Sequence, residues 1–157
     1  MVVKNMKRIC LIGSSGGHFE QLMMLKPLID KHGGFIVTEK TDYIVSVKDI
    51  QTYYLKQVNR QEKKFVFLMI TNFIKSLKIF IKEKPDVVIS TGALATIPMC
   101  MIGKMLKKKI IFIESFAKID SPTLTGKFVY KFADQFYVQW ESMLEVYPNA
   151  IYKGAIY

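Results

Sequence analysis

The sequence predicts an α/β protein with a mostly parallel, Rossmann-like sheet and helices on both faces. Short apolar runs alternate along the chain with longer segments of helical periodicity, which is the order of elements in parallel sheets. The apolar runs are continuous, as in strands that are covered on both faces. The chain has 157 residues, half of them apolar, which is enough for one packed domain. We therefore expect a single domain over residues 1–157.

The first part of the chain contains three predicted strands and one predicted helix. Lys7–Gly13 is a short apolar run that ends in glycine and predicts a buried strand. Phe19–Lys31 has apolar residues near helical spacing, and Pro27 is expected to kink this helix. A glycine pair ends the helix. Phe35–Thr38 is then the second strand, and the loosely alternating Thr52–Val58 is the third.

The middle of the chain predicts a long amphipathic helix. Lys64–Lys84 repeats apolar residues at helical spacing, and the proline that follows it ends the helix. At about 100° per residue, the lysines at positions 75, 78 and 82 share one face. The opposite face carries Val66, Ile70, Phe73, Leu77 and Phe80. Periodicity leaves open whether this segment packs on the core or meets lipid.

The remaining elements follow the same alternation. Short apolar runs predict strands at Asp86–Ser90, Lys109–Glu114, Gln135–Gln139 and Ala150–Tyr152. Helical spacing predicts helices at Leu94–Leu106, Thr123–Phe132 and Glu141–Val146. The chain shows no internal repeat and no linker, which agrees with one domain.

Charge is the strongest signal in the composition. The formal net charge is +10, and residues 61–110 carry ten basic and three acidic side chains, so an anionic partner is expected. The chain has two arginines, Arg8 and Arg60, and arginine is the residue that nucleic-acid binders place on phosphates and bases. Lysine beside Met, Phe and Ile fits an anionic membrane surface better. We therefore expect membrane contact and no nucleic acid.

The cysteines and the apolar segments limit the class of protein further. Cys10 and Cys100 are ninety positions apart, so we expect neither a disulfide framework nor a metal site, and the chain is typical of a reducing, intracellular compartment. The run Ile9–Ile12 is too short for a signal peptide. The longest apolar-rich stretch, Phe65–Ile81, has 12 apolar residues in 17 and contains two lysines, so no transmembrane helix is predicted.

A loop of small residues follows the first predicted strand. It consists of Gly13, Ser14, Ser15, Gly16, Gly17 and His18. In open parallel sheets, ligands bind beyond the carboxyl ends of the strands, and glycines let a backbone approach a ligand closely. Three glycines and two serines before a helix therefore favour a ligand-binding loop over a plain turn.

Known loop motifs narrow the chemistry of this loop. It lacks the Gly-Lys-Ser/Thr of a Walker A loop. A Gly-x-Ser-x-Gly nucleophile elbow would need a later histidine, but His18 and His32 both flank the first predicted helix. Glu39 lies near the distance at which dinucleotide-binding folds place a ribose-binding acid. A free-standing Rossmann-type dinucleotide-binding oxidoreductase is therefore kept as an alternative function.

His18 is the first candidate catalytic residue. It begins the predicted helix, where the helix dipole disfavours the imidazolium and leaves a neutral ring that can accept a proton. The alternative is a polar residue that touches the ligand without taking part in chemistry. The sequence leaves both interpretations open.

Two further polar motifs follow predicted strands. Thr91 and Gly92 follow the strand that ends at residue 90, while Glu114 and Ser115 stand at the end of the next strand. Because the carboxyl ends of parallel strands share one edge, we expect both motifs beside the first loop. A carboxylate accepts hydrogen bonds from sugar hydroxyls, which makes Glu114 a second candidate. An ordinary turn and a surface glutamate remain the alternatives.

The residues expected at the membrane lie in segments 64–82 and 98–109. They are Lys75, Lys78, Met99, Met101, Met105, Lys107, Lys108 and Lys109. Methionine beside lysine suits a lipid surface, although a methionine stripe is equally typical of a core.

Three motifs, taken in order, resemble those of one protein family. They are Gly-Ser-Ser-Gly-Gly-His at 13–18, Ser-Thr-Gly-Ala-Leu-Ala-Thr-Ile-Pro at 90–98 and Ile-Glu-Ser-Phe-Ala at 113–117. Together they resemble the PssD/CpsF capsule-biosynthesis proteins, bacterial relatives of asparagine-linked glycosylation protein 14. Such proteins look like the N-terminal half of a MurG-type GT-B glycosyltransferase. Ala93 stands where MurG proteins have a second glycine, and Ile113 stands where they have a histidine.

The resemblance implies an accessory subunit of a two-chain glycosyltransferase, which moves a sugar from a UDP-sugar to a lipid-pyrophosphate-linked saccharide in capsular or exopolysaccharide synthesis. This chain would bind the acceptor and recruit a separate catalytic subunit to the membrane. The UDP-sugar would lie on that partner, so this chain would bind no cofactor and would be inactive or weak alone. The implied location is cytoplasmic, peripheral on the inner face of the plasma membrane.

The resemblance also implies roles for single residues. His18 would be the base, and the first loop would bind the acceptor with Thr91, Gly92 and Ser115. The apolar C-terminal end, residues 147–157, is the expected docking strip for the partner, through Tyr152, Ile156 and Tyr157.

Overall fold

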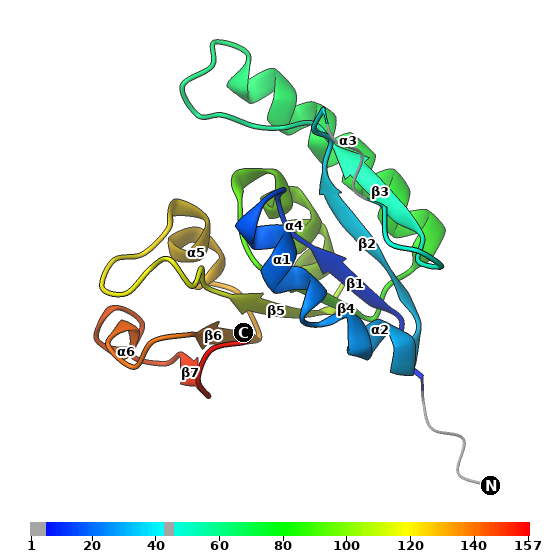
Figure 1. Ribbon diagram of the computed structural model, residues 1–157. Coiled ribbons are helices and arrows are strands. Elements are labelled where there is room, and N and C mark those ends of the chain that lie inside the picture. Colours follow the sequence, from blue (N-terminus) through cyan, green and yellow to red (C-terminus); the bar gives the residue numbers. More distant parts are fainter. Residues whose placement is uncertain (1–5, 43–45) are drawn as a thin grey trace, which may run out of the picture.

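The computed structural model describes residues 6–42 and 46–157, and in this part of the chain seven strands form one sheet (Figure 1). The strands are β1 Ile9–Ile12, β2 Gly34–Glu39, β3 Thr52–Leu55, β4 Val87–Ser90, β5 Lys109–Ile113, β6 Gln135–Val138 and β7 Ile151–Tyr152. Their order across the sheet is β3-β2-β1-β4-β5-β6-β7, and every neighbouring pair is parallel. The predicted Rossmann-like parallel sheet is confirmed.

Seven helical segments connect these strands within the described residues. They are α1 Gly17–Met23, α2 Lys26–His32, α3 Phe65–Glu83, η1 Leu94–Thr96, α4 Ile97–Met105, α5 Leu124–Val129 and α6 Met143–Val146. The prediction of one kinked helix over Phe19–Lys31 is wrong, because the chain forms two helices there. Pro27 lies in the first turn of α2, where its missing N–H donor is not needed, so it begins a helix.

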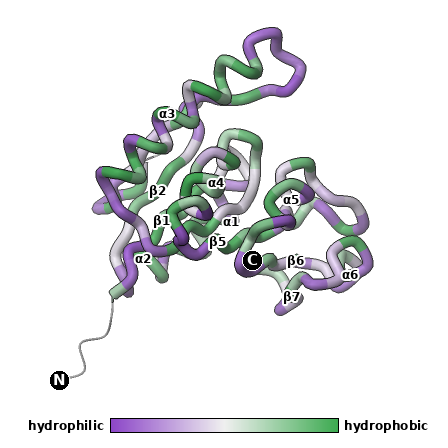
Figure 2. Tube along the Cα trace, turned by 180° about the vertical axis from the view of Figure 1, so that it is seen from behind, coloured by the Kyte–Doolittle hydropathy of each residue, from purple (hydrophilic) through white to green (hydrophobic). Residues whose placement is uncertain are grey.

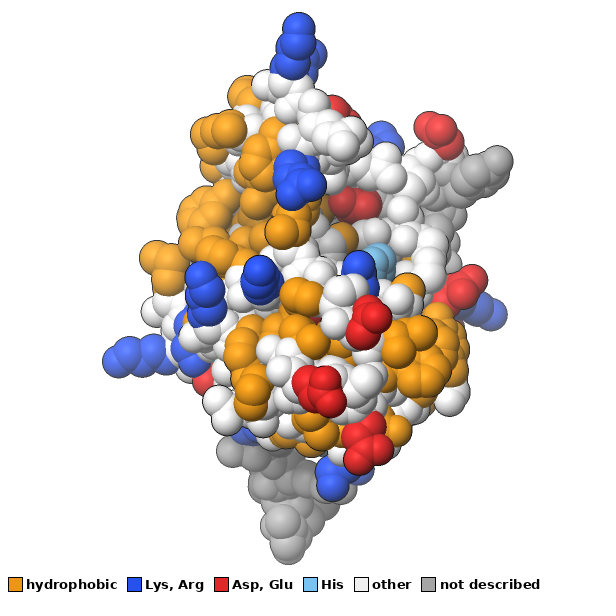
Figure 3. Space-filling view, turned by 90° about the vertical axis from the view of Figure 1, so that its left-hand side faces the viewer, with side chains coloured by type: hydrophobic (Ala, Val, Ile, Leu, Met, Phe, Trp, Pro, Cys, Tyr) orange, Lys and Arg blue, Asp and Glu red, His pale blue; other side chains and the backbone are white. Residues whose placement is uncertain are grey.

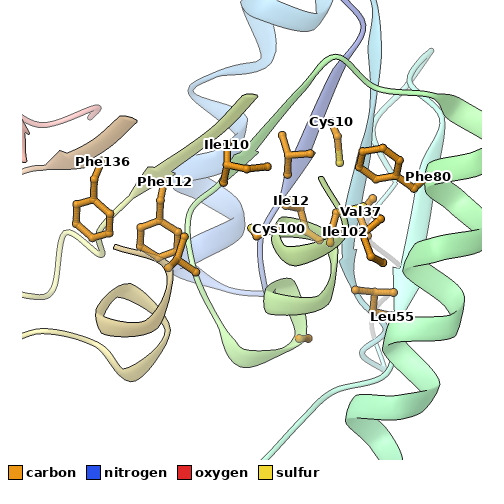
Figure 4. Close-up of a cluster of buried hydrophobic side chains, with 14 of the residues drawn as sticks. Cys10, Ile12, Val37, Leu55, Phe80, Cys100, Ile102, Ile110, Phe112 and Phe136 are labelled. Atoms are coloured by element: carbon orange, nitrogen blue, oxygen red, sulfur yellow. The ribbon is translucent and has the colours of Figure 1, made fainter. Parts of the chain in front are cut away.

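Helices cover both faces of the sheet, as the sequence predicts (Figure 1). On one face, α3, α4 and α5 pack on strand residues that include Cys10, Val37 and Phe112 (Figure 4). On the other face, α1 and α2 pack on residues that include Leu11 and Ile36. Successive side chains of a strand point to opposite faces, so β1 contributes to both clusters and is buried along its whole length.

The strand register brings the candidate loops to one edge of the sheet. Ile12 pairs with Ser90, and Ser90 pairs with Phe112. The carboxyl ends of β1, β4 and β5 therefore lie level, and the loops that follow them meet there. The candidate ligand loops at 13–18 and 91–93 are neighbours for this reason.

α3 buries polar side chains and exposes apolar ones. Its buried residues are Asn72, Ser76, Ile79, Phe80 and Glu83. Its exposed apolar residues are Val66, Phe67, Ile70, Ile74, Leu77 and Ile81. Hydrophobic and hydrophilic segments alternate along the helix in Figure 2. The apolar face that the sequence predicts is therefore split, because Phe80 packs in the core whereas Val66 and Ile70 face outward.

Asn72 explains why this side of α3 turns inward. β3 ends at Leu55, three residues before the predicted end, and Asn72 binds the next residue along the chain. The Asn72 side-chain oxygen accepts a hydrogen bond from Lys56 N at 2.9 Å, and its amide donates to Lys56 O at 2.8 Å. These two hydrogen bonds hold Asn72 on the inner side of α3, where Ile79 and Phe80 also pack in the core. The apolar residues on the opposite side of the helix remain exposed.

A buried carboxylate joins α3 to the amino edge of the sheet. Glu83 accepts hydrogen bonds from the Arg8 guanidinium and the Tyr53 hydroxyl. Burial by itself raises the pKa of Glu83, but the hydrogen bonds from Tyr53 and Arg8 and the Arg8 charge outweigh it and hold the pKa below its usual range. The ionised form therefore stabilises the fold.

We predict that Glu83→Gln lowers the free energy of unfolding at neutral pH by about 1–3 kcal/mol, because Arg8 and Tyr53 lose their charged acceptor. Since the pKa of Glu83 is lowered in the folded chain, its contribution is present above the unfolded pKa of about 4.3 and is lost as the pH falls through the folded pKa. Urea unfolding over a series of pH values measures both effects. The exposed Glu62→Gln is the matched control, and equal unfolding free energies for the two variants at neutral pH would contradict the prediction.

Candidate functional site

The candidate site lies at the carboxyl edge of the sheet, where two loops contact each other. Nδ1 of His18 lies 2.9 Å from the carbonyl oxygen of Thr91, and the Thr91 hydroxyl donates to the carbonyl oxygen of His18 at 2.9 Å. The absence of a side chain at Gly13 and Gly92 lets the two loops come this close. A Cβ at Gly13 would lie 2.5 Å from Thr91 Oγ1, and one at Gly92 would lie 3.4 Å from the His18 ring. Two reciprocal hydrogen bonds therefore hold the loops together.

The contact with Thr91 determines which nitrogen of His18 faces outward. A carbonyl oxygen can only accept a hydrogen bond, so Nδ1 carries the hydrogen in this contact. In the neutral ring, Nε2 then keeps a free lone pair. The side chain is partly exposed, so an incoming hydroxyl group can reach it. His18 thus has the tautomer that a general base needs.

The outer side of the first loop is open. Gly16 and Gly17 are exposed, and a Cβ at either position would meet no atom within 4 Å. Gly16 has φ +71°, a left-handed conformation that favours glycine. Ser14 and Ser15 are partly exposed beside them. The outer side of the loop at Gly16 and Gly17 is therefore accessible to solvent, at the place where the sequence predicts ligand binding.

Thr91 and Gly92 do not have the role predicted for them. Both are buried, and the carbonyl and hydroxyl of Thr91 both bind His18. The prediction of direct ligand contact by these two residues is wrong, because the strand-end groups satisfy the neighbouring loop. Thr91 instead orients the His18 ring, and Gly92 leaves room for it.

The next residue carries backbone strain. Ala93 has φ +81° and ψ +149°, a region that residues other than glycine rarely occupy. The Thr96 N–H and hydroxyl both donate to the Ala93 carbonyl, at 3.1 and 2.8 Å, and hold it there. Strain of this kind clusters at functional sites, which supports this edge as the site.

Glu114 is a buried structural residue. Its side chain is 1% exposed, and its carboxylate accepts hydrogen bonds from Ser115 N at 2.9 Å, Thr123 Oγ1 at 2.9 Å and Tyr147 OH at 2.8 Å. Burial and then the Glu114 charge raise the pKa of Tyr147, so its hydroxyl remains a donor. Ser115 is also buried and accepts from Ala117 N. The predictions of a catalytic Glu114 and a ligand-binding Ser115 are wrong, because both side chains hold the protein together internally.

Glu39 lies at the end of β2 and is buried. Burial raises its pKa, and hydrogen bonds with the Val58 backbone, the Ser14 side chain and the Ser15 backbone offset this only in part. A carboxylate that is engaged in this way is not presented to a ribose. Glu39 therefore does not support the alternative function, a dinucleotide-binding oxidoreductase.

A buried amide pair adjoins the site and escapes prediction from the sequence. Gln139 follows β6, and its Nε2 donates to Oε1 of Gln21 on α1 at 2.8 Å. The two residues are 118 positions apart, and isolated glutamines carry no pattern, so the fold alone reveals the pair. Thr123 and Tyr147, which bind Glu114, escape prediction for the same reason.

The predicted membrane residues divide into exposed and buried ones. The exposed or partly exposed ones are Lys75, Lys78, Met101, Met105, Lys107, Lys108 and Lys109. Met105 is the most exposed of these methionines, at 72%, whereas Met99 is fully buried. Membrane contact by Met99 is therefore a wrong prediction, because this residue lies on the side of α4 that packs on the sheet.

Exposed apolar side chains gather on the face of the sheet that α3, α4 and α5 cover. We call this the apolar surface, and it comprises Val66, Phe67, Ile70, Ile74, Leu77, Ile81, Met101, Met105 and Phe128. Between α4 and α5 it dips into a groove of about 190 Å³ that Met101, Met105, Phe128 and Phe132 line with Lys104. In the upper half of Figure 3, hydrophobic side chains lie beside basic ones.

The C-terminal segment is accessible on its outer side. Tyr152 and Tyr157 are exposed. Ile156 is partly buried and, with Gly154, lines an apolar cavity of about 280 Å³ whose walls include Ile111 and Tyr137 of the sheet.

Residues 6–42 and 46–157 contain neither a helix that could span a membrane nor a candidate metal cluster. In these ranges no helix combines the length and the apolar composition needed to cross a bilayer. The same residues contain no cluster of three His, Cys, Asp or Glu side chains that could hold a metal ion.

The chain has relatives among known proteins, and it shares its fold with solved structures. Residues 50–156 match the family model described as "Oligosaccharide biosynthesis protein Alg14 like". The UDP-N-acetylglucosamine transferase subunit ALG14 of Yarrowia lipolytica is 28% identical over 97% of this chain and 82% of its own length.

Two solved structures share the fold. Acinetobacter baumannii MurG matches 86% of this chain with a TM-score of 0.69 and 13% identity. The UDP-N-acetylglucosamine 2-epimerase of Rickettsia bellii matches 96% with a TM-score of 0.71 and 17% identity. This chain spans 42% and 45% of those two chains, and at such low identity the likeness shows the fold alone. The family match, by contrast, extends over more than half of the sequence, and the chain therefore belongs to the Alg14 family.

Proposed function

We propose that this chain is the acceptor-side subunit of a two-chain, UDP-sugar-dependent glycosyltransferase that works at a membrane surface. The observation that carries the proposal is the contact between Nδ1 of His18 and the Thr91 carbonyl, beside an exposed glycine loop. It supports a role of Nε2 as the base. The Y. lipolytica relative is named as a transferase subunit, which supports a function shared with a second polypeptide.

The proposed partner is a separate catalytic chain that carries the donor site. This chain matches 42% of the MurG structure, and the partner would supply the counterpart of the remainder. The UDP-sugar would bind there, so this chain would bind no cofactor and would be inactive or weak alone. UDP-N-acetylglucosamine is the first donor to test, because the names of the relatives carry it.

In the proposed reaction, Nε2 of His18 takes the proton of an acceptor hydroxyl while that oxygen attacks the anomeric carbon of the sugar. The new carbon–oxygen bond forms as the bond from the anomeric carbon to the phosphate oxygen of UDP breaks, and UDP leaves. Thr91 holds the ring through Nδ1, so the lone pair of the neutral ring is on Nε2. The residues proposed to bind the acceptor are Ser14, Ser15, Gly16 and Gly17, which are exposed or partly exposed.

The proposed acceptor is a saccharide linked to a lipid pyrophosphate. A lipid-linked substrate requires an enzyme that stays at the membrane, and the apolar surface with its lysines suits an anionic bilayer. The motif resemblance to PssD/CpsF proteins supports capsular or exopolysaccharide synthesis, at the inner face of the plasma membrane, as the setting.

The proposed docking strip for the partner is the C-terminal segment. Tyr152 and Tyr157 present exposed aromatic rings, and aromatic residues are enriched at the centres of interfaces. Ile156 lines the apolar cavity against the sheet, so a partner side chain can enter beside it. These features support the docking role that the resemblance implies.

Co-expression with a glycosyltransferase-like polypeptide from the same organism tests the proposal. We expect transfer from labelled UDP-N-acetylglucosamine to a lipid-pyrophosphate-linked acceptor when both polypeptides are present, because each supplies half of the site. Full transfer by the partner alone would overturn the subunit role. Tight NADH binding by this chain, without transfer in the pair, would favour the oxidoreductase alternative.

His18→Gln is expected to lower kcat of the complex about 10²–10⁴-fold, because glutamine cannot take up the proton. His32→Gln, on the partly exposed histidine that ends α2, serves as the control and should leave kcat unchanged. Wild-type kcat in His18→Gln would remove this residue from the chemistry.

Serine at Phe67, Ile70 and Ile74 is expected to weaken binding to phosphatidylglycerol vesicles at least about tenfold, since each inserted apolar side chain contributes on the order of 1 kcal/mol. Vesicle flotation measures this loss. Met24→Ser, at an exposed apolar residue that ends α1, is the matched control. Equal flotation of the triple variant and the control would show that α3 does not meet the bilayer.

A further inference from the structure

A buried chain of hydrogen bonds connects the helix that carries His18 with the C-terminal segment. Gln21 and Gln139 are each 4% exposed, and Nε2 of Gln139 donates to Oε1 of Gln21 at 2.8 Å. The same nitrogen donates to the carbonyl oxygen of Glu114 at 2.9 Å. Oε1 of Gln139 accepts from the backbone N–H of Ile156 at 3.1 Å.

The partners of Gln139 admit a single orientation of its amide. The Glu114 carbonyl can only accept and the Ile156 N–H can only donate, so Nε2 must face the first and Oε1 the second. Gln21 must then turn its own oxygen toward Gln139. Because unpaired buried amide groups are costly, the three elements that meet here are held in one arrangement.

One end of this hydrogen-bond chain lies on the helix of His18, and the other end lies in the C-terminal segment. Gln21 stands one helical turn after His18 on α1, and residues three apart share a helix face. Ile156 lies in the segment that lines the apolar cavity. The following residue, Tyr157, packs its ring against Phe116, with ring centroids 5.3 Å apart. A shift of this segment would therefore act directly on Gln139.

We propose that Gln21 and Gln139 are positioning residues that couple docking of the catalytic partner to the placement of His18. The inference rests on the proposed function, in which the segment around Ile156 is the docking strip. A partner seated there fixes the Ile156 N–H, Gln139 keeps its orientation, and Gln21 holds α1 and the ring of His18 toward the acceptor. The unpartnered chain then holds its base less firmly than the complex does.

Hydrogen exchange on the unmodified chain, free and in complex with its partner, tests the coupling without any substitution. We expect the partner to slow exchange both at Ile156 and at the amides of residues 19–23 in α1. Slowing at Ile156 alone would overturn the coupling and leave the docking strip intact. Slowing at neither place would overturn the docking strip of the proposed function, and the inference would fall with it.

Kinetics of the complex give a second, independent test. Gln139→Met and Gln21→Met are each expected to lower kcat about tenfold with little change in KM, because the base is misplaced while the acceptor loop remains. The double variant should be no worse than Gln139→Met alone, since that substitution already removes the contact with Gln21. The control is Gln135→Met, at a partly exposed glutamine that begins β6, the strand that Gln139 follows. Wild-type kcat in the Gln139 and Gln21 variants, or losses that multiply in the double variant, would refute the relay.

Discussion

The parallel pairing of β1 with β2 on one side and β4 on the other is the constraint on which the rest of this protein depends. It buries all four residues of β1 and places a helical layer on each face of the sheet. It also places the ends of β1 and β4 side by side. Gly13 and Thr91 are therefore close neighbours, and the ring of His18 contacts the carbonyl oxygen of Thr91, 73 positions away in the sequence. The geometry of the candidate base is thus a consequence of strand register.

Much of the fold could be predicted, because parallel strands need continuous apolar runs and these are visible in the sequence. The rotation of α3 about its own axis could not be predicted. Its apolar residues suggest an inward side, yet Asn72 turns inward to satisfy the backbone of Lys56, a demand that arises only when β3 ends at Leu55. Helical periodicity indicates which residues share a face of the helix. It does not indicate which face packs against the rest of the protein.

The places of the candidate residues in the fold could be predicted, but the hydrogen bonds of their side chains could be predicted only in part. The glycine loop and His18 lie where the motif places them, but Thr91 and Glu114 have polar groups that bind their own protein. A polar residue at a strand end can serve a ligand or the adjacent loop, and both uses have the same sequence signature. The tautomer of His18 and the contact between Gln21 and Gln139 depend on segments 73 and 118 residues apart, beyond the reach of any local pattern.

The exposed apolar side of α3 also has a thermodynamic consequence for the chain as a whole. A bilayer that takes up Phe67 and Ile70 from the folded chain, where they are already presented on one side of a helix, acts as a ligand of the native state. By mass action, any such ligand raises the free energy of unfolding as its concentration increases. If the proposed membrane contact of α3 holds, the free energy of unfolding measured in water alone would be lower than the value at the bilayer.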